Sequence, residues 1–390
     1  MLRLEIRPEP SKVMAYASPV VALGLTLVIC GVLFICLGAD PVRGLELFFL
    51  EPIKNARALG ELSIKATPLL LIGLGLCVCF RANVWNIGAE GQFILGAVCA
   101  GGVALYATEQ TGGYVIALIL GAGVLGGVAW AALVAVLRDR FNASEILVSL
   151  MLVYVAEQVL AYLVYGPWRD PLGYNFPQTA TFAASARIPR LFTGSRANIG
   201  LPLALLLAGL FWVFLHRTHA GYKLRVGGLS PLAARYAGFS SRQALWTACL
   251  VSGGMAGLAG ALEATGPLGQ LTLYVPLGYG FAAIIVAFVG RLSPVGVIFS
   301  SVLLSMFYIG GELSQSRLGL PKSLTSVFQG LLLLSLLASD TLVYRRIRWV
   351  GRPAPRISAG DVASGGASTT GTVVGDTAAT NTPGEAGHPS

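Results

Sequence analysis

Three carboxylates stand inside long apolar runs, away from the ends of those runs: Glu90, Glu157 and Glu263. A carboxylate that faced lipid would be costly, so we expect each one to face protein or an aqueous path. Glu90 also lies between Asn86 and Gln92, whose amide groups can both donate and accept hydrogen bonds. This pattern fits a site that passes a polar solute, and it also fits hydrogen bonds that hold two helices together. The sequence leaves both interpretations open.

Catalytic and nucleotide-binding patterns are missing from the chain. It has no G-x-x-x-x-G-K-[ST] phosphate loop, no H-E-x-x-H and no G-x-S-x-G. The six cysteines lie within or beside apolar runs and only three histidines are present, so we expect neither a metal site nor a disulfide framework. We therefore expect no enzyme and no cofactor. The alternative is an intramembrane enzyme that uses His216 or His219.

Composition places the chain in a membrane. Its residues are 55% hydrophobic and only 12% charged, against roughly 25% charged in soluble domains. The apolar residues fall in blocks of about twenty, the length of a helix that crosses a bilayer. The basic residues form no stripe with aromatic residues between them, so no nucleic-acid partner is expected. We predict an all-α, polytopic integral membrane helix bundle of about ten segments, at residues 18–38, 61–80, 87–107, 113–137, 144–166, 199–216, 243–264, 275–290, 294–312 and 324–343.

Flanking charges predict how these segments are oriented. With residues 1–17 inside, seventeen of the 27 lysines and arginines fall on the inner side, which favours this orientation over its inverse. Both chain termini are then expected in the cytoplasm. The apolar run from Val20 to Leu37 is longer than a signal-peptide core. We interpret it as a retained helix, with Ser18 as its N-cap and Pro19 in its first turn.

The predicted transmembrane domain covers residues 18–344. Three stretches of the chain, two within this domain and one after it, are not membrane segments. Residues 167–198 contain four prolines and form a long extracytoplasmic loop in this prediction. Residues 217–242 form a basic inner loop with helical character. Residues 345–390 begin as a basic stub and continue, from Arg352, with small and polar residues that cannot build a core. We expect this tail to be disordered.

Two breaks interrupt the helical pattern within apolar surroundings, near residues 81–92 and near residues 276–294. Backbone groups freed by a break persist at membrane depth only where protein or a watery cavity surrounds them. Paired breaks are therefore typical of a transport path. In both places an apolar run, an arginine and a break occur together, which suggests a weak internal repeat. Glycines spaced four apart predict close helix contacts elsewhere, at Gly123 and Gly127 and at Gly253 and Gly257.

The basic inner loop carries a helix signal of its own. Ser230-Pro231 fits an N-cap and a first turn, small residues follow, and Gly238 fits a C-terminal stop. We predict a short helix between these points. From physical chemistry alone, such a helix can be a plain surface connector or a docking site for another protein.

Several of these stretches resemble a known family. Asn86-Ile-Gly-Ala-Glu-Gly-Gln92, Gly228-Leu-Ser-Pro-Leu-Ala-Ala-Arg-Tyr-Ala-Gly238 and Val286-Ala-Phe-Val-Gly-Arg-Leu-Ser-Pro294 are similar to motifs of one permease superfamily. That superfamily serves branched-chain amino-acid, simple-sugar and nucleoside ABC importers. The resemblance covers about residues 15–345 and is closest to the nucleoside branch. One departure is Val153, where the family often has asparagine; if that asparagine contacts solute in relatives, the substrate differs here.

The resemblance implies a membrane-spanning permease subunit of an ABC importer in the inner membrane. Such a subunit moves a small polar solute, here most closely a nucleoside, by alternating access. The implied partners are a cytoplasmic ABC ATPase subunit that binds the ATP, a second homologous permease, an extracytoplasmic substrate-binding lipoprotein and membrane lipid. The alternatives are a simple-sugar permease and a proton-coupled secondary transporter that uses Glu90 or Glu157.

Two sets of residues follow from the same resemblance. A solute path is expected along the first break and the neighbouring segments, at Asn86, Glu90, Gln92, Tyr154, Glu157 and Glu263. Coupling to the ATPase subunit is expected along the inner loop, at Gly221, Arg225, Gly228, Pro231, Ala234, Arg235 and Gly238.

Overall fold

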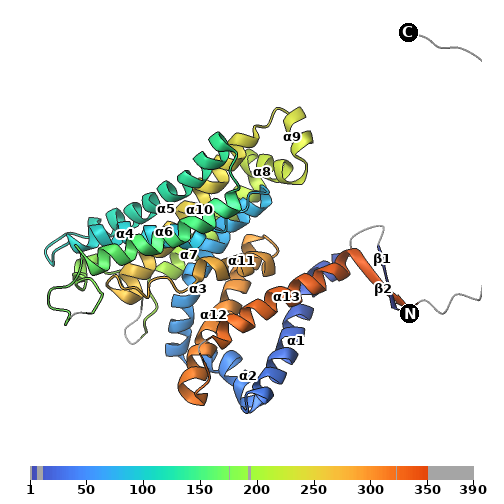
Figure 1. Cartoon of the computed structure of the whole chain (residues 1–390), viewed down its shortest axis with the longest axis horizontal. Coiled ribbons are helices and arrows are strands. Elements are labelled where there is room, and N and C mark those ends of the chain that lie inside the picture. The colour runs from blue at the N-terminus through green and yellow to red at the C-terminus, as the bar shows by residue number, and fades with distance from the viewer. Residues whose placement is uncertain (1, 7–11, 175, 192–194, 322, 350–390) are drawn as a thin grey trace, which may run out of the picture. The chain divides into compact units, whose positions relative to one another are not determined.

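The described residues of the computed structural model (Figure 1) are 2–6, 12–174, 176–191, 195–321 and 323–349. The chain divides into two compact units, of which the larger is Pro8–Tyr344 and the smaller holds the two chain ends. In the smaller unit, β1 (Leu2–Ile6) pairs antiparallel with β2 (Arg345–Trp349), with Leu2 opposite Trp349. The predicted disorder of the tail from Arg352 lies outside the described residues.

Every predicted membrane segment corresponds to an apolar helix of the larger unit, so the all-α bundle of about ten segments is confirmed. These helices are α1 (Lys12–Cys36), α3 (Ala56–Arg81), α4 (Ala89–Leu105), α5 (Tyr114–Phe141), α6 (Glu145–Tyr165), α7 (Gly200–Arg217), α10 (Ser241–Glu263), α11 (Tyr279–Val289), α12 (Pro294–Leu318) and α13 (Leu324–Tyr344). Within the described residues, eight helices are long and apolar enough to cross a membrane. The two shorter ones are α4 and α11.

Residues 275–290 do not form one continuous membrane helix, in line with the break expected near residues 276–294. Helix α11 has 11 residues and rises about 16 Å, which is half of a ~30 Å hydrocarbon core. The residues just before this helix, from Gly269 to Gly278, are not helical. Gly278 itself has a φ of 77° and so marks where the extended chain turns into the helix. The chain between α10 and α12 therefore enters the bundle as an extended segment and continues as a half-helix.

Shorter elements connect the long helices. Helix α2 (Pro41–Phe49), absent from the prediction, begins where the Asp40 carboxylate accepts a hydrogen bond from the Val42 N–H at 2.9 Å. The 3-10 turn η1 (Glu51–Ile53) follows, and Arg317 of α12 donates to its Glu51 at 2.9 Å. That hydrogen bond lowers the pKa of Glu51 from its ordinary value of 4.5. After α7, the short helices α8 (His219–Leu229) and α9 (Pro231–Tyr236) form the basic inner loop.

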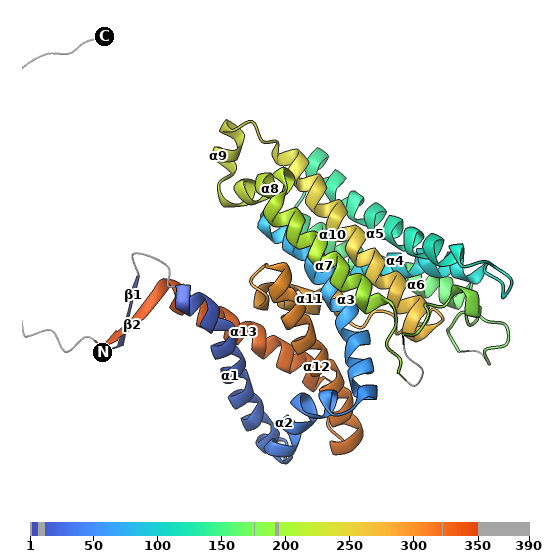
Figure 2. The same cartoon turned by 180° about the vertical axis from the view of Figure 1, so that it is seen from behind.

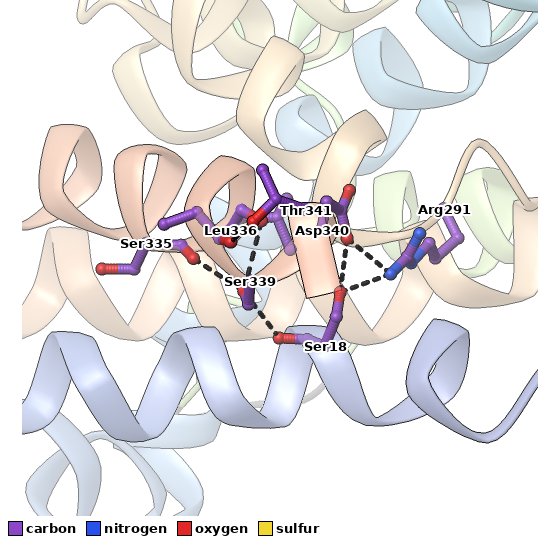
Figure 3. Close-up of polar contacts among 8 residues, drawn as sticks. Ser18, Arg291, Ser335, Leu336, Ser339, Asp340 and Thr341 are labelled. Atoms are coloured by element: carbon purple, nitrogen blue, oxygen red, sulfur yellow. Dashed lines mark hydrogen bonds and ion pairs between the residues drawn. The ribbon is translucent and has the colours of Figure 1, made fainter. Parts of the chain in front are cut away.

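Ser18 is not an N-cap, because α1 begins earlier, at Lys12. Its hydroxyl instead donates to the Asp340 carboxylate of α13 at 2.5 Å and accepts from Arg291, the second residue after α11. Arg291 also bonds to Asp340 directly, at 2.7 Å, as Figure 3 shows. We term Ser18, Arg291 and Asp340 the polar clamp. It joins α1 and α13 to the turn that follows α11.

Helix α3 lies at the centre of the larger unit. It packs against α10 on one side and against α11 and α12 on another, while α1 packs along α13 (Figures 1 and 2). Helices α4, α5 and α10 form a second tight group. The half-helix α11 therefore contacts α3, α4, α12 and α13 rather than standing at the edge of the bundle.

The two predicted glycine pairs pack against each other. A Cβ at Gly127 of α5 would lie 2.1 Å from the carbonyl oxygen of Gly253 in α10, and one at Gly257 would lie 2.2 Å from the carbonyl oxygen of Gly123. No side chain larger than hydrogen fits at these distances, so the backbones of α5 and α10 are in direct contact. The predicted close approach is confirmed, and each motif is the partner of the other.

Candidate functional site

The two helix breaks meet in space at Glu90. Its carboxylate accepts hydrogen bonds from the backbone N–H groups of Gly278, at 2.9 Å, and Gly280, at 2.5 Å. Both groups lie at the start of α11, where unpaired N–H groups and the helix dipole favour a negative charge. Glu90 is only 1% exposed, so no bulk water competes for these bonds. The carboxylate therefore links the first turn of α4 to the first turn of α11.

The approach of α4 and α11 depends on a missing side chain. A Cβ at Gly280 would lie 2.2 Å from the backbone nitrogen of Glu90. Any other residue at this position would push the two helix starts apart and break the hydrogen bonds to the carboxylate. The glycine at position 280 and the glutamate at position 90 thus form one structural pair.

Asn86 and Gln92 form a closed amide pair beside this contact. The Asn86 Nδ2 donates to the Gln92 Oε1 at 2.9 Å, and the Gln92 Nε2 donates to the Asn86 Oδ1 at 3.1 Å. Asn86 also donates to the hydroxyl of Ser252 in α10, at 3.0 Å. All three side chains are buried. The two amides lie close together in the sequence. In this conformation each one satisfies hydrogen-bonding groups of the other.

We term Asn86, Glu90, Gln92, Gly278 and Gly280 the break junction. Its hydrogen bonds come from the loop after α3, from α4 and from the start of α11, three pieces of chain that a helical pattern alone would leave unconnected. Discontinuous helices of this kind can present polar groups to a solute and can move as short rigid pieces. The arrangement can therefore both hold a polar molecule and change shape.

The inner end of α11 is held as firmly as its start. The Arg81 Nε, at the end of α3, donates to the carbonyl oxygen of Leu292 at 2.9 Å. Arg291 and Leu292 have φ angles of 56° and 52°, in the left-handed region that such side chains rarely adopt. Backbone strain of this kind persists only where surrounding contacts impose it. Here Arg81 and the polar clamp supply those contacts.

The remaining predicted path residues lie in three different settings. Glu263, on α10, is 4% exposed and forms no hydrogen bond or ion pair with another described residue. Glu157, on α6, is half-buried and interacts electrostatically with Glu90. Tyr154 is 58% exposed on the outer face of α6, whereas its neighbour Val153 is buried against Gly91 of α4. The structure thus brings Glu157 near the break junction and leaves Tyr154 away from it.

A second polar group, not predicted from the sequence, lies between α3, α11 and α12. The Lys65 Nζ is 3.1 Å from the Glu312 carboxylate and 5.9 Å from the centre of the Tyr279 ring. The rings of Tyr279 and Tyr308 are 5.2 Å apart, and the Tyr308 hydroxyl donates to the Leu277 carbonyl at 3.3 Å. The sequence signal for this second polar group is Lys65, a lysine inside the apolar run 61–80. Its place near the outer end of that run also fits a simple flanking charge.

The inner loop is built onto the end of α3. A Cβ at Gly228 would lie 2.0 Å from the carbonyl oxygen of Arg81, and one at Gly221 would lie 2.3 Å from the carbonyl oxygen of Phe214 in α7. Leu224 is buried between these contacts. Helix α8 therefore packs directly under the residue that begins the first break. Two of the predicted coupling positions, Gly221 and Gly228, lie in this packed layer rather than on a free surface.

Helix α9 extends away from that layer. Its predicted start is confirmed, since the Ser230 side chain accepts from the Ala233 N–H and Pro231 occupies the first turn. Its predicted stop is also confirmed, because Gly238 has a φ of 76°. Ala234 is buried, while Arg235 is exposed and Tyr236 is 94% exposed. Arg225 of α8 is exposed as well. The loop thus presents a short, capped helix with apolar and basic side chains facing outward.

Side chains that commonly bind metals do not cluster in the described part of the chain. No group of three or more histidine, cysteine, aspartate or glutamate side chains is arranged there to hold a metal ion. All six cysteines are free thiols. What the geometry offers is polar contacts inside a membrane bundle, with short helices able to shift.

Comparison with known proteins agrees with this geometry. The model of the family described as branched-chain amino acid transport system / permease component matches residues 58–337. The glucose ABC transporter permease protein TsgB13 of Haloferax volcanii is 32% identical over 87% of this chain and 92% of its own length. The guanosine ABC transporter permease protein NupP of Bacillus subtilis is 28% identical, over 82% and 92%. The nucleoside ABC transporter permease protein NupB of Lactococcus lactis is 25% identical, over 79% and 87%. No solved structure matches the chain.

Proposed function

The chain belongs to the branched-chain amino acid transport permease family, and from that premise we propose that it is the permease of an importer for nucleosides. It is a multi-pass membrane protein whose family consists of transport subunits rather than enzymes. Membership implies an ATPase partner and a substrate-binding protein. The proposal adds the substrate class, the inner membrane, and an orientation with both termini in the cytoplasm.

The break junction is the observation that carries the transport proposal. Two discontinuous helices, α4 and α11, start beside each other and are held by one buried carboxylate. Side-chain hydrogen bonds hold α11 at either end, through Glu90 at its start and through Arg81 at the turn behind it. A short helix held this way can shift as a unit when those contacts change, which is the movement that alternating access requires.

Energy would reach the junction through α9 and α8. We place the ATPase subunit on the exposed face of α9, where Arg235 and Tyr236 are accessible. A push on α9 passes to α8, and Gly228 of α8 touches the carbonyl of Arg81. Arg81 in turn holds the turn after α11. This chain of contacts connects the docking surface to the half-helix without any covalent step.

Nucleosides suit the chemistry of the junction because they are neutral and rich in hydrogen-bonding groups. Amide side chains such as Asn86 and Gln92 can match both the donors and the acceptors of such a solute. Relatives named for guanosine and nucleoside transport support this choice. A sugar is the second candidate, because the relative with 32% identity is named for glucose. A second homologous permease and a lipid-anchored binding protein complete the proposed complex.

Reconstitution tests the proposal. The chain would be assembled in liposomes with its ATPase subunit, its second permease and its binding protein, and uptake of labelled uridine, guanosine and glucose would be measured. We expect uptake of a nucleoside with ATP and none with ADP. Uptake of glucose alone would assign the sugar branch instead. Uptake by the isolated chain along a proton gradient, without ATP, would contradict the proposal and favour a secondary transporter.

A further inference from the structure

Several buried polar groups of the described residues make no hydrogen bond, among them one on α10 and one on α11. The Glu263 carboxylate of α10 makes no hydrogen bond or ion pair with another described residue, although Glu263 is 4% exposed. The Tyr279 hydroxyl of α11 also has no hydrogen-bond partner among the described residues, and this side chain is fully buried. Glu263 and Tyr279 are near enough to interact electrostatically. Lys65 of α3 lies close to both, since its Nζ is 5.9 Å from the centre of the Tyr279 ring and it also interacts with Glu263.

The surroundings of these two groups resemble a ligand site more than a core. Lys65 lies over the Tyr279 ring at 5.9 Å and forms an ion pair with Glu312 at 3.1 Å. The ring of Tyr308 lies beside that of Tyr279, at 5.2 Å. Aromatic faces with a few placed polar groups are typical of small-molecule sites. Here both kinds of group come from four different helices.

Stability does not explain why these groups are present. A buried hydroxyl or carboxylate that lacks a partner is unfavourable, since it has lost water and gained nothing in return. Phenylalanine at position 279 would keep the ring contacts with Phe93 and Tyr308. Glutamine at position 263 would remove a buried charge at the same volume. Either change would remove a group that makes no hydrogen bond to another described residue, so hydrogen bonding within the fold does not account for these groups.

We propose that Glu263 and Tyr279 bind adjacent hydroxyl groups of a neutral solute as it crosses the membrane. This inference rests on the proposed transport function and adds the part of the solute that is recognised. A carboxylate accepts hydrogen bonds from two neighbouring hydroxyls, and such charge-assisted bonds are stronger than neutral ones. The tyrosine hydroxyl donates to or accepts from the same group. The ribose of a nucleoside and a hexose share this chemistry.

The ion pair of Lys65 and Glu312 lies beside these groups and reaches the surface. The side chain of Glu312 is half exposed, whereas that of Lys65 is nearly buried. Lys65 also interacts with Glu263, so it links an accessible carboxylate to a buried one. Tyr279 is also the first residue of α11, next to the Gly278 and Gly280 N–H groups that Glu90 holds. Movement of α11 would therefore change the site directly.

Binding can be tested on the full chain in detergent, without partners. Thermal unfolding would be followed during titration with uridine, with glucose and with dideoxyuridine, which lacks both ring hydroxyls of the ribose. We expect uridine or glucose to raise the unfolding temperature of the wild type and dideoxyuridine not to. Glu263→Gln should weaken binding about tenfold or more, because it removes a charged acceptor, and Tyr279→Phe about fivefold. Neither variant should unfold earlier than wild type without solute.

Glu46→Gln and Tyr274→Phe are the matched controls, because both side chains are exposed and lie apart from the site. They should bind as the wild type does. The proposal is overturned if Glu263→Gln and Tyr279→Phe respond like wild type, if dideoxyuridine stabilises as well as uridine, or if neither uridine nor glucose stabilises the wild type. Binding through Glu263 by a chain that imports nothing in the assembled complex would contradict the proposed function alone.

Discussion

Glu90→Gln separates two roles that a buried carboxylate can have in this bundle. The wild-type side chain accepts one hydrogen bond on each oxygen, from Gly278 and from Gly280. Glutamine has the same shape but a single acceptor oxygen, and its NH₂ group would point at a second donor. The substitution therefore removes the charge, one hydrogen bond, and the partner of one buried backbone N–H group.

The expected loss follows from these contacts. A hydrogen bond to a charged group contributes about 1.5–3 kcal/mol, and an unsatisfied buried donor costs about 1–3 kcal/mol. Allowing for partial relaxation of α11, we expect a loss of about 2–4 kcal/mol in the free energy of unfolding. At roughly 2 °C per kcal/mol for a chain of this size, the unfolding temperature should fall by about 4–8 °C.

Glu263→Gln is the matched comparison. It removes a buried carboxylate of the same type, but one without a hydrogen bond to another described residue. We expect no fall in its unfolding temperature. Both variants would be purified in detergent as full chains, and unfolding would be followed by the loss of the monodisperse peak after heating. Surface expression would be compared in parallel.

An unfolding temperature of Glu90→Gln within about 1 °C of wild type would refute the structural role, since a charged hydrogen bond cannot be lost, and a buried donor left unpaired, at so small a cost. Altered uptake by such a stable variant would then assign Glu90 to the solute path alone. A fall in stability together with altered uptake of the surviving protein would show that the same carboxylate does both.

Three further predictions concern coupling, topology and packing. Arg235→Glu should leave membrane insertion intact but reduce recovery of the ATPase subunit on affinity purification, because it reverses an exposed charge on the docking face; full recovery with full uptake would place docking elsewhere. Single cysteines at Leu172 and Ser241 in a cysteine-free chain should differ in intact cells, with only Leu172→Cys labelled by an impermeant thiol reagent. Labelling at both positions would refute the proposed orientation. Gly127→Ala should lower the unfolding temperature by several degrees, because its methyl group would lie 2.1 Å from the Gly253 carbonyl oxygen; the control Gly121→Ala, which meets open space, should change little.

The sequence by itself determined the elements whose signals are local. Twenty-residue apolar runs specify membrane helices because a helix satisfies its backbone hydrogen bonds within one segment, as lipid requires. The capped helix α9 followed from Ser230, Pro231 and Gly238, since caps and stops depend on neighbouring residues only. The small-residue motifs of α5 and α10 predicted close contacts for the same reason. In each case, residues within one or two helical turns carry the information.

Long-range contacts were decided by the tertiary structure. The start of α1 at Lys12, before Pro19, was not predicted from the sequence. A proline can stand within a helix when other contacts hold the helix there, as the contacts of Ser18 with α13 do. The sequence indicated a break near residues 276–294, but it could not show that the break would lie against Glu90 of α4, since that contact joins residues far apart in the chain.

The roles of the buried carboxylates show the same limit most clearly. Glu90 and Glu263 look alike as sequence, each a single acid in an apolar run. Glu90 is hydrogen-bonded by residues about 190 positions away, whereas Glu263 makes no hydrogen bond or ion pair with another described residue. A carboxylate is held or left free by donors that the fold brings to it. Only the three-dimensional arrangement of α4, α10 and α11 decides which of the two it is.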